Sequence, residues 1–186
     1  MAVGFRGTIL TSSDGTTWTS QTSGVSEYLR SITYSSALSL FIAVGDSGTI
    51  LTSPNGTTWT SRTSGATIDL RGITYSSDLG LFVAVGDDGT ILTSPTGTTW
   101  TSQTSGVSII LYGITYSSAL GLFVAVGQNG TILYSVIISD TNIIDHLTED
   151  SDMTFNLAVG ENTLQVTNVS RVFKSRLTYR QKYLGV

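Results

Sequence analysis

Two arginines and three aspartates recur at matching positions of this sequence and are the first candidates for chemistry. Arg30 and Arg71 are 41 residues apart, while Asp46, Asp87 and Asp88 each lie one or two residues before a glycine. Carboxylates in such loops could bind calcium or the hydroxyl groups of a sugar. Aspartate before glycine is also ordinary turn composition. Other copies of the loop carry no carboxylate. We favour the interpretation that these aspartates form the turn and bind no ligand.

His146 is the single histidine and lies in the acidic segment 145–152, DHLTEDSD. A histidine among carboxylates could hold a divalent metal or act as a general base. The sequence has no cysteine and no second histidine, and the segment lacks EF-hand spacing. We therefore favour a solvated acidic loop and predict no metal, no cofactor and no catalytic residue, so the chain is not expected to be an enzyme.

The candidate arginines and aspartates belong to a repeat of 41 residues. Residues 43–83 and 84–124 are identical at 33 of 41 positions, and residues 2–42 match 43–83 at 28 of 41. A partial copy, 125–135, ends the repeats. A period near 40 residues predicts an architecture in which each unit buries its apolar face against a neighbour.

Each repeat reads as four short strands, expected in one copy at Leu70–Ser76, Leu81–Gly86, Thr90–Ser94 and Thr99–Thr104. The dipeptides Asp14-Gly15 and Asn55-Gly56 predict type I′ hairpin turns. Four antiparallel strands per repeat predict an all-β, β-propeller-like array of four-stranded blades, about 3.5 repeats in all. A β-solenoid is the lesser alternative.

A family resemblance supports the propeller. Ser12–Trp18 and its copies at 53–59 and 94–100 resemble the Asp-box of BNR-type propellers, although one residue is missing and Asn55 and Thr96 replace the aspartate. The resemblance implies a hairpin that staples a blade, with the tryptophan packed between blades. A sugar platform is the alternative role of the tryptophans Trp18, Trp59 and Trp100.

Some BNR-type propellers are sialidases, which need three arginines, a tyrosine nucleophile and acidic partners. Arg30 and Arg71 are equivalent, but the third copy has Tyr112. We therefore exclude glycoside hydrolysis.

The strand count leaves about three and a half blades, whereas closed propellers have four to eight. Two chains would supply seven blades, so we expect a homo-oligomer that completes the propeller. The alternative is that C-terminal strands complete the last half-blade within one chain.

Residues 136–186 differ in composition from the repeats of 1–135, and we expect them to form a separate β-module. Strands are expected at 136–139, 153–159, 163–168 and 171–184, with a loop at 145–152. The phrase DSDMTFNLAVGENTLQV and the ending LTYRQKYLGV resemble the C-terminal end of siphophage distal-tail proteins. A degenerate fifth repeat, echoing AVGQNGTIL, is the alternative.

The last expected strand alternates basic and apolar residues, because strand side chains point to opposite faces in turn. It could dock on an acidic partner, or its charges could protect a solvated edge. The residues assigned to assembly are Lys174, Arg176, Tyr179, Arg180 and Tyr183.

The repeats differ mostly in the loop between blades and the loop between second and third strands. Strand direction alternates, so both loops should emerge on the same face, where binding groups concentrate. Drift in exposed loops is the alternative. The predicted ligand-binding residues are Tyr28, Arg30, Arg71, Asp87, Asp88 and Tyr112.

Composition excludes several function classes. The net charge is −4 with nine Lys and Arg in 186 residues, so no nucleic-acid partner is expected. No apolar run reaches the length of a membrane span, and no signal peptide is expected. We read the sequons at Asn55, Asn129 and Asn168 as turns.

Together these features predict a non-enzymatic structural or adhesion component of a phage tail. Its propeller face would contact a host-surface ligand, with glycan as the expected chemistry, and its C-terminal strands would bind other tail proteins. The expected location is the virion, or otherwise an extracellular or cytoplasmic soluble pool. An oligomeric lectin that binds glycans between blades is the alternative function.

Overall fold

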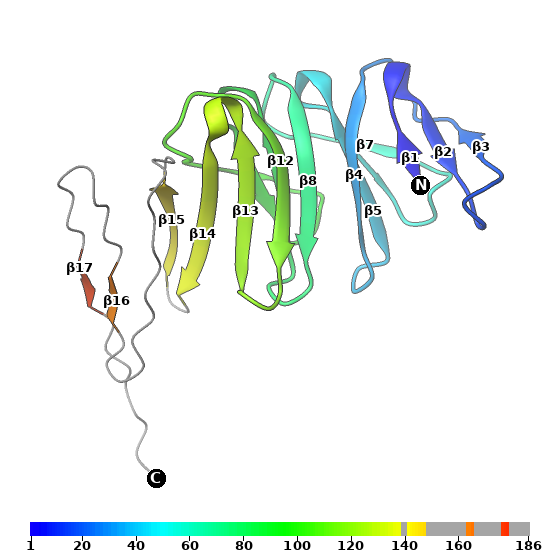
Figure 1. Cartoon of the computed structure of the whole chain (residues 1–186). Helices are drawn as coiled ribbons and strands as arrows, with labels where there is room; N and C mark the ends of the chain where they lie inside the picture. The colour runs from blue at the N-terminus through cyan, green and yellow to red at the C-terminus, as the bar shows by residue number, and fades with distance from the viewer. Residues whose placement is uncertain (139–140, 148–162, 166–175, 179–186) are drawn as a thin grey trace, which may run out of the picture. The chain divides into compact units, whose positions relative to one another are not determined.

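The structure, a computed structural model, describes residues 1–138, 141–147, 163–165 and 176–178. The chain divides into two compact units, Met1–Thr148 and Glu149–Val186. In the second unit β16 (Thr163–Gln165) pairs antiparallel with β17 (Arg176–Thr178). The first unit holds four antiparallel sheets (Figure 1), so the predicted all-β class is confirmed.

Three of the four sheets have four strands in sequence order. The first sheet contains β1 (Ala2–Val3), β2 (Ile9–Thr11) and β3 (Thr19–Gln21). The second contains β4 (Leu29–Ser35), β5 (Leu40–Gly45), β6 (Ile50–Ser53) and β7 (Thr60–Arg62). The third contains β8 (Leu70–Ser76), β9 (Leu81–Gly86), β10 (Ile91–Ser94) and β11 (Thr101–Gln103). The fourth contains β12 (Leu111–Ser117), β13 (Leu122–Gly127), β14 (Ile132–Ile138) and β15 (Thr141–Leu147).

The repeated sequence predicted the bounds of these strands closely. β8 and β9 have the predicted bounds, and β10 and β11 lie within theirs. Alternating apolar and polar residues place one set of side chains on each face of a strand. The nearly continuous apolar run of β9 instead fills both faces, with Phe82 and Ala84 in one core cluster and Val83 and Val85 in the next. The third sheet therefore presents an apolar face to each of its two neighbours, as propeller blades do.

The last sheet is completed by the chain itself. β14 crosses the boundary expected between residues 135 and 136, and β15 pairs with it from Ile132↔Leu147 to Ile138↔Thr141. The loop expected from residue 145 is wrong for 145–147, which belong to β15. The open edge of β14 pairs with β15, although the composition of β15 only weakly predicts a strand. Of the other C-terminal expectations, 153–159 lies outside the described residues, and β16 and β17 fall within 163–168 and 171–184.

The predicted type I′ turns are wrong at Asp14-Gly15 and Asn55-Gly56. Only the glycine of each pair has positive φ, whereas a type I′ turn needs positive φ at both central positions. Asp14 Oδ1 instead accepts the amides of Thr16 and Thr17, both at 2.8 Å, and this shapes the turn.

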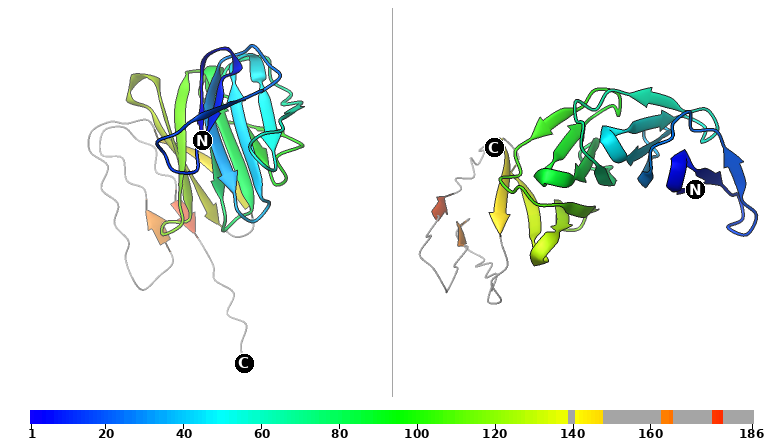
Figure 2. Two further views of the ribbon diagram at one scale, coloured as in Figure 1. Left: turned by 90° about the vertical axis from the view of Figure 1, so that its right-hand side faces the viewer. Right: turned by 90° about the horizontal axis from the view of Figure 1, so that it is seen from above.

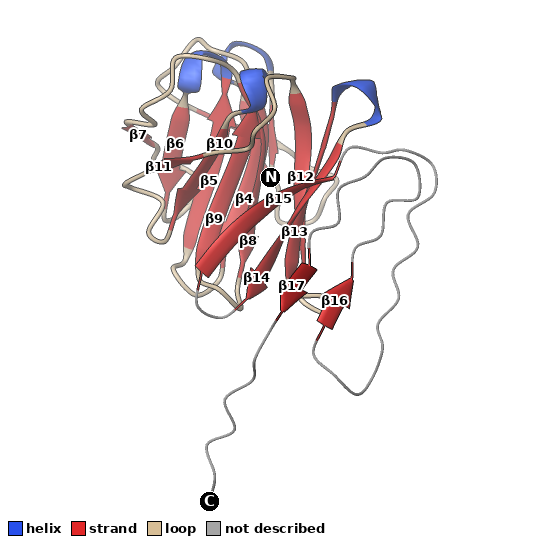
Figure 3. Cartoon of the chain, turned by 90° about the vertical axis from the view of Figure 1, so that its left-hand side faces the viewer, coloured by secondary structure: helices blue, strands red, loops and turns tan. Residues whose placement is uncertain are grey.

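Two consecutive residues with positive φ occur at a different turn of each repeat. They are Arg6-Gly7, Ser47-Gly48, Asp88-Gly89 and Asn129-Gly130. Each pair ends a one-turn 3-10 helix: η1 (Phe5–Gly7), η2 (Asp46–Gly48), η3 (Asp87–Gly89) and η4 (Gln128–Gly130). All four lie at one end of the sheets (Figure 3). Among the described residues no helix is long and apolar enough to cross a membrane.

The core lies between neighbouring sheets, which follow one another along an arc (Figure 2). Ile42, Val44 and Ile50 of the second sheet pack against Phe82 and other residues of the third. Trp59 packs in the cluster between the first and second sheets, and Trp100 in that between the second and third. The predicted inter-blade packing is confirmed for these two tryptophans.

Candidate functional site on the loop face

Both variable loops of each repeat meet at the end of the sheets that carries the 3-10 turns, which we call the loop face. The amide of Asp46 donates to the Tyr28 carbonyl at 2.9 Å, and the amide of Asp87 donates to the Asp69 carbonyl at 2.9 Å. The segment that enters each sheet therefore lies against the 3-10 turn of the same sheet. The prediction that the two loops share a face is confirmed.

A β-bulge presents one side chain of each four-stranded sheet at this face. Leu29 pairs with Gly45 and Ser31 with Val44, so Arg30 is the extra residue. The same shift makes Arg71 and Tyr112 the extra residues of β8 and β12. Bulges commonly re-aim a side chain next to a functional site. Nothing in the repeat text signalled this irregularity.

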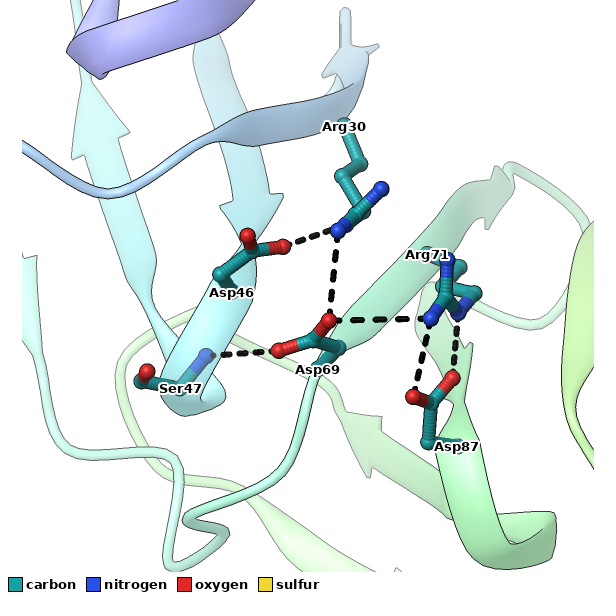
Figure 4. Close-up of polar contacts among 6 residues, drawn as sticks. All are labelled: Arg30, Asp46, Ser47, Asp69, Arg71 and Asp87. Carbon is teal, nitrogen blue, oxygen red and sulfur yellow. Dashed lines mark hydrogen bonds and ion pairs between the residues drawn. The ribbon is translucent and has the colours of Figure 1, made fainter.

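The Arg30 guanidinium joins the second sheet to the third (Figure 4). Its Nε donates to Asp46 Oδ1 beside it, and its Nη2 donates to Asp69 Oδ2 at 3.2 Å. Asp69 also accepts the amide of Ser47 through Oδ1, at 3.2 Å. Asp69 precedes β8, so its carboxylate ties the third sheet to both β4 and the η2 turn.

Arg71 repeats the arrangement one sheet further on. Its Nη2 lies 3.6 Å from Asp69 Oδ2, and Asp87 receives both its Nε and its Nη2, the latter at 2.9 Å. Such two-point pairing fixes the planes of both groups. The hydrogen bonds from Arg71 hold the pKa of Asp87 below its usual value, and the same pairing raises the pKa of Arg71. Both groups therefore stay charged over the physiological range.

Exposed aromatic rings flank the ion pairs on both sides. Phe5 and Tyr28 have ring centroids 4.6 Å apart, and the Arg30 Cζ atom lies 6.0 Å from the Tyr28 centroid. At the other end, Arg71 Cζ lies 5.9 Å from the exposed ring of Tyr112. Both distances are within the range of cation–π contact.

These contacts connect one continuous chain of planar groups from the first sheet to the fourth, which we call the Arg–aromatic row. Its members are Arg6, Phe5, Tyr28, Arg30, Asp46, Asp69, Arg71, Asp87 and Tyr112.

The row is suited to recognition. Phe5, Tyr28 and Tyr112 are about half exposed, while Arg30 and Arg71 are held by Asp46, Asp69 and Asp87. A surface whose polar groups are already positioned loses little conformational entropy on binding. Tyrosine and arginine are also the residues most enriched at binding hot spots.

Five of the six predicted ligand-binding residues belong to the row. The exception is Asp88, an exposed residue of η3 with φ 52°, whose side chain makes no hydrogen bond or ion pair with a described residue. The prediction missed Asp69 and did not foresee that Asp46 and Asp87 pair with the arginines.

A sequence signal for those pairs does exist. Arginine and aspartate stand 16 residues apart in two repeats, as Arg30 with Asp46 and as Arg71 with Asp87. Both are replaced together in the fourth sheet, by Tyr112 of β12 and Gln128 of η4. Two positions that change together within one chain indicate contact.

The other candidate residues lie on other elements or outside the described residues. His146 lies on β15, and the described residues contain no group of three His, Asp or Glu side chains placed to hold a metal ion. Of the predicted assembly residues, Arg176 lies on β17, and Lys174, Tyr179, Arg180 and Tyr183 lie outside the described residues.

Comparisons with known proteins support the fold. No protein-family model and no curated protein matches the sequence. A solved structure of YCF48 bound to a D1 peptide matches with a TM-score of 0.60 and 17% sequence identity. The match covers 88% of this chain and 55% of that one, so this chain spans about half the length of that neighbour. YCF48 is a β-propeller protein, and this chain has propeller-type repeats.

Proposed function

We propose that the protein is a non-enzymatic binding module whose ligand lies along the Arg–aromatic row. The observation that carries this proposal is the contact chain itself. It places Tyr28 and Tyr112 at either side of two ion-paired arginines on one face. Its length across four sheets fits an extended polymer better than a small molecule, which would need an enclosed pocket.

The charge of the row favours a neutral ligand that carries many hydroxyl groups. Arg30 and Arg71 are already matched by three carboxylates, those of Asp46, Asp69 and Asp87. An anionic ligand would have to displace those partners. Hydroxyl groups can donate to the carboxylates and accept from the guanidinium groups while both ion pairs persist. A host-surface glycan has this chemistry, and tyrosine faces offer it apolar contact.

A peptide is the second candidate ligand. The observation in its favour is the neighbour YCF48, whose solved structure contains a D1 peptide. Exposed tyrosine and arginine side chains also serve peptide recognition. The glycan remains our first candidate because the ion pairs of the row leave few groups free to read charged peptide side chains.

The setting that we propose is a phage tail, with the C-terminal strands contacting neighbouring tail subunits. It is supported by the resemblance of roughly the last 45 residues to the C-terminal end of siphophage distal-tail proteins. β16 and β17 are paired in register, with Gln165 opposite Arg176. Deletion of residues 149–186 should abolish incorporation into particles and leave the first unit folded; incorporation of the deleted chain would contradict this setting.

The binding proposal is tested with arrays of neutral glycans and of peptides, probed with the full chain. We expect the wild type to bind glycans and the double variant Tyr28→Ala, Tyr112→Ala to lose at least about tenfold in affinity, as for removal of hot-spot side chains. Leu120→Ala is the matched control, because Leu120 is exposed but belongs to a hairpin at the opposite end of the fourth sheet. Equal binding by the wild type and the double variant would contradict the proposal, and binding to peptides alone would identify the second candidate.

A further inference from the structure

The interface between successive sheets uses the same residues each time. One face of a sheet, which we call the forward face, presents Val44 in the second sheet and Val85 in the third. The opposite face of the next sheet, which we call the back face, presents Ala84 and Leu92 in the third sheet, and Ala125 and Leu133 in the fourth.

The forward face of the fourth sheet presents the same residues, and no described strand of the first unit covers it. Val126 occupies the position of Val44 and Val85, which are both 0% exposed, yet Val126 is 48% exposed. Val124 is half-buried where its equivalent Val83 is buried. The difference lies in the missing neighbour, because these strands share their sequence and their pairing.

The back face of the first sheet likewise has no neighbouring sheet among the described strands of the first unit. Trp18 is 44% exposed, whereas its equivalents Trp59 and Trp100 pack in the clusters between sheets. Ala2 is exposed, whereas its equivalent Ala43 is fully buried. Each end of the array therefore offers the half of an interface that the other end lacks.

We propose that a second copy of this chain covers these ends, with the Trp18 face of one copy packed on the Val126 face of the other. The occupant is identified by continuity with the interfaces inside the chain, where the same two types of face meet. This inference goes beyond the proposed ligand binding and does not depend on it.

The contact is head-to-tail, and such contacts give rings when the rotation closes. The four sheets follow an arc, and two copies supply eight sheets, within the range of closed propellers (Figure 2). The first sheet has three strands, so this interface buries less surface than the internal ones. We therefore expect a dimer whose population depends on concentration.

The test uses two variants of the full chain, each blocked on one face. Val126→Asp blocks the forward face, and Trp18→Asp blocks the back face. Analytical ultracentrifugation and native mass spectrometry should show a dimer for the wild type. Each variant alone should dimerise about a hundredfold more weakly or worse, because an unpaired carboxylate is costly in an apolar interface.

Mixing the variants is the decisive measurement, since each keeps the face that the other has lost. A 1:1 pair should form in the mixture alone, and it should carry one intact interface. Thermal melting of each variant checks that its fold is retained.

Leu120→Asp is the control, because Leu120 and its equivalents Leu38 and Leu79 are exposed whether or not the sheet is covered. It should dimerise like the wild type. A monomeric wild type would overturn the proposal. That result is expected if residues 149–186 cover the Val126 face within one chain. Unchanged dimerisation of Val126→Asp would overturn it as well.

Discussion

The Asp69 carboxylate receives Arg30 from the neighbouring sheet at 3.2 Å, and the same oxygen lies 3.6 Å from Arg71. One carboxylate thus joins two repeats through the same position of each. The η2 turn is held by the other oxygen, through the amide of Ser47. The arrangement fixes the middle of the Arg–aromatic row and leaves its ends free to contact a ligand.

Removal of Asp69 should destabilise the fold measurably. Asp69→Ala removes one of the two carboxylate partners of Arg30 and of Arg71, which keep Asp46 and Asp87, and it removes the side-chain acceptor of the Ser47 amide. We expect a loss of about 1 kcal/mol in the free energy of unfolding. Urea unfolding of the first unit measures this loss of stability. Asp88→Asn is the control, because asparagine tolerates positive φ and Asp88 has no ion pair with a described residue. A loss that is equal in both variants would contradict the bridging role.

The tryptophans should differ in their contribution to stability although their sequence contexts match. Trp59→Ala removes a ring from the cluster between two sheets and should cost about 3 kcal/mol. Trp18→Ala removes a ring that is exposed on an uncovered face and should cost about 1 kcal/mol or less in the monomer. Denaturant titration at low protein concentration compares them. Equal costs would indicate that Trp18 is buried in solution.

Thr96→Asn should stabilise the third repeat. Asn55 Oδ1 accepts the amides of Thr57 at 3.0 Å and Thr58 at 2.9 Å. Thr96 Oγ1, at the same position, accepts a single amide, that of Thr98 at 3.3 Å. An added hydrogen bond of this kind is worth about 1 kcal/mol, which should appear as a higher melting temperature. Asn55→Thr, the reverse change, should lower stability by a similar amount, and a gain from it would contradict the account.

Asp14 should give the first repeat a pH dependence that the second lacks. Amide hydrogen bonds from Thr17 and then Thr16 hold the pKa of Asp14 well below its usual value. Since the folded-state pKa is lower than the unfolded one, the stabilisation is complete above pH ~4 and is lost as pH falls further.

Asp14→Asn provides the comparison, because Asn55 makes the same contacts without a charge. The stability difference between wild type and Asp14→Asn should shrink on acidification below pH ~4. A difference that stays constant through that range would show that the carboxylate is not held in its charged form.

The strands of the repeats could be predicted because nearly the same sequence occurs three times and its apolar and polar residues alternate. β8 and β9 have their predicted bounds for this reason. β15 was missed because an edge strand is fixed by the open hydrogen-bonding groups of β14, and Asp145 and His146 weigh against a strand on composition alone. The turn at Asp14-Gly15 was mistaken because the side-chain hydrogen bonds of Asp14 outweigh the dipeptide preference.

The shared face of the candidate residues was predicted, and their contacts were predicted only in part. Strand alternation correctly placed the two variable loops at one end of the sheets, where Tyr28, Arg71 and Tyr112 lie, while their role in binding stays a prediction. The ion pairs depend on the β-bulge that makes Arg30 and Arg71 extra residues, and period-two alternation cannot reveal a bulge. Joint replacement of both partners in the fourth sheet, by Tyr112 and Gln128, was the available signal.

The most direct test of the central claim is an NMR titration of the isotope-labelled full chain with a glycan or peptide that binds on the arrays. We predict that chemical-shift changes concentrate on the loop face, at Phe5, Tyr28, Arg30, Arg71 and Tyr112. Changes concentrated at the opposite end, around the Ser12–Trp18 turn and its copies, would contradict the account.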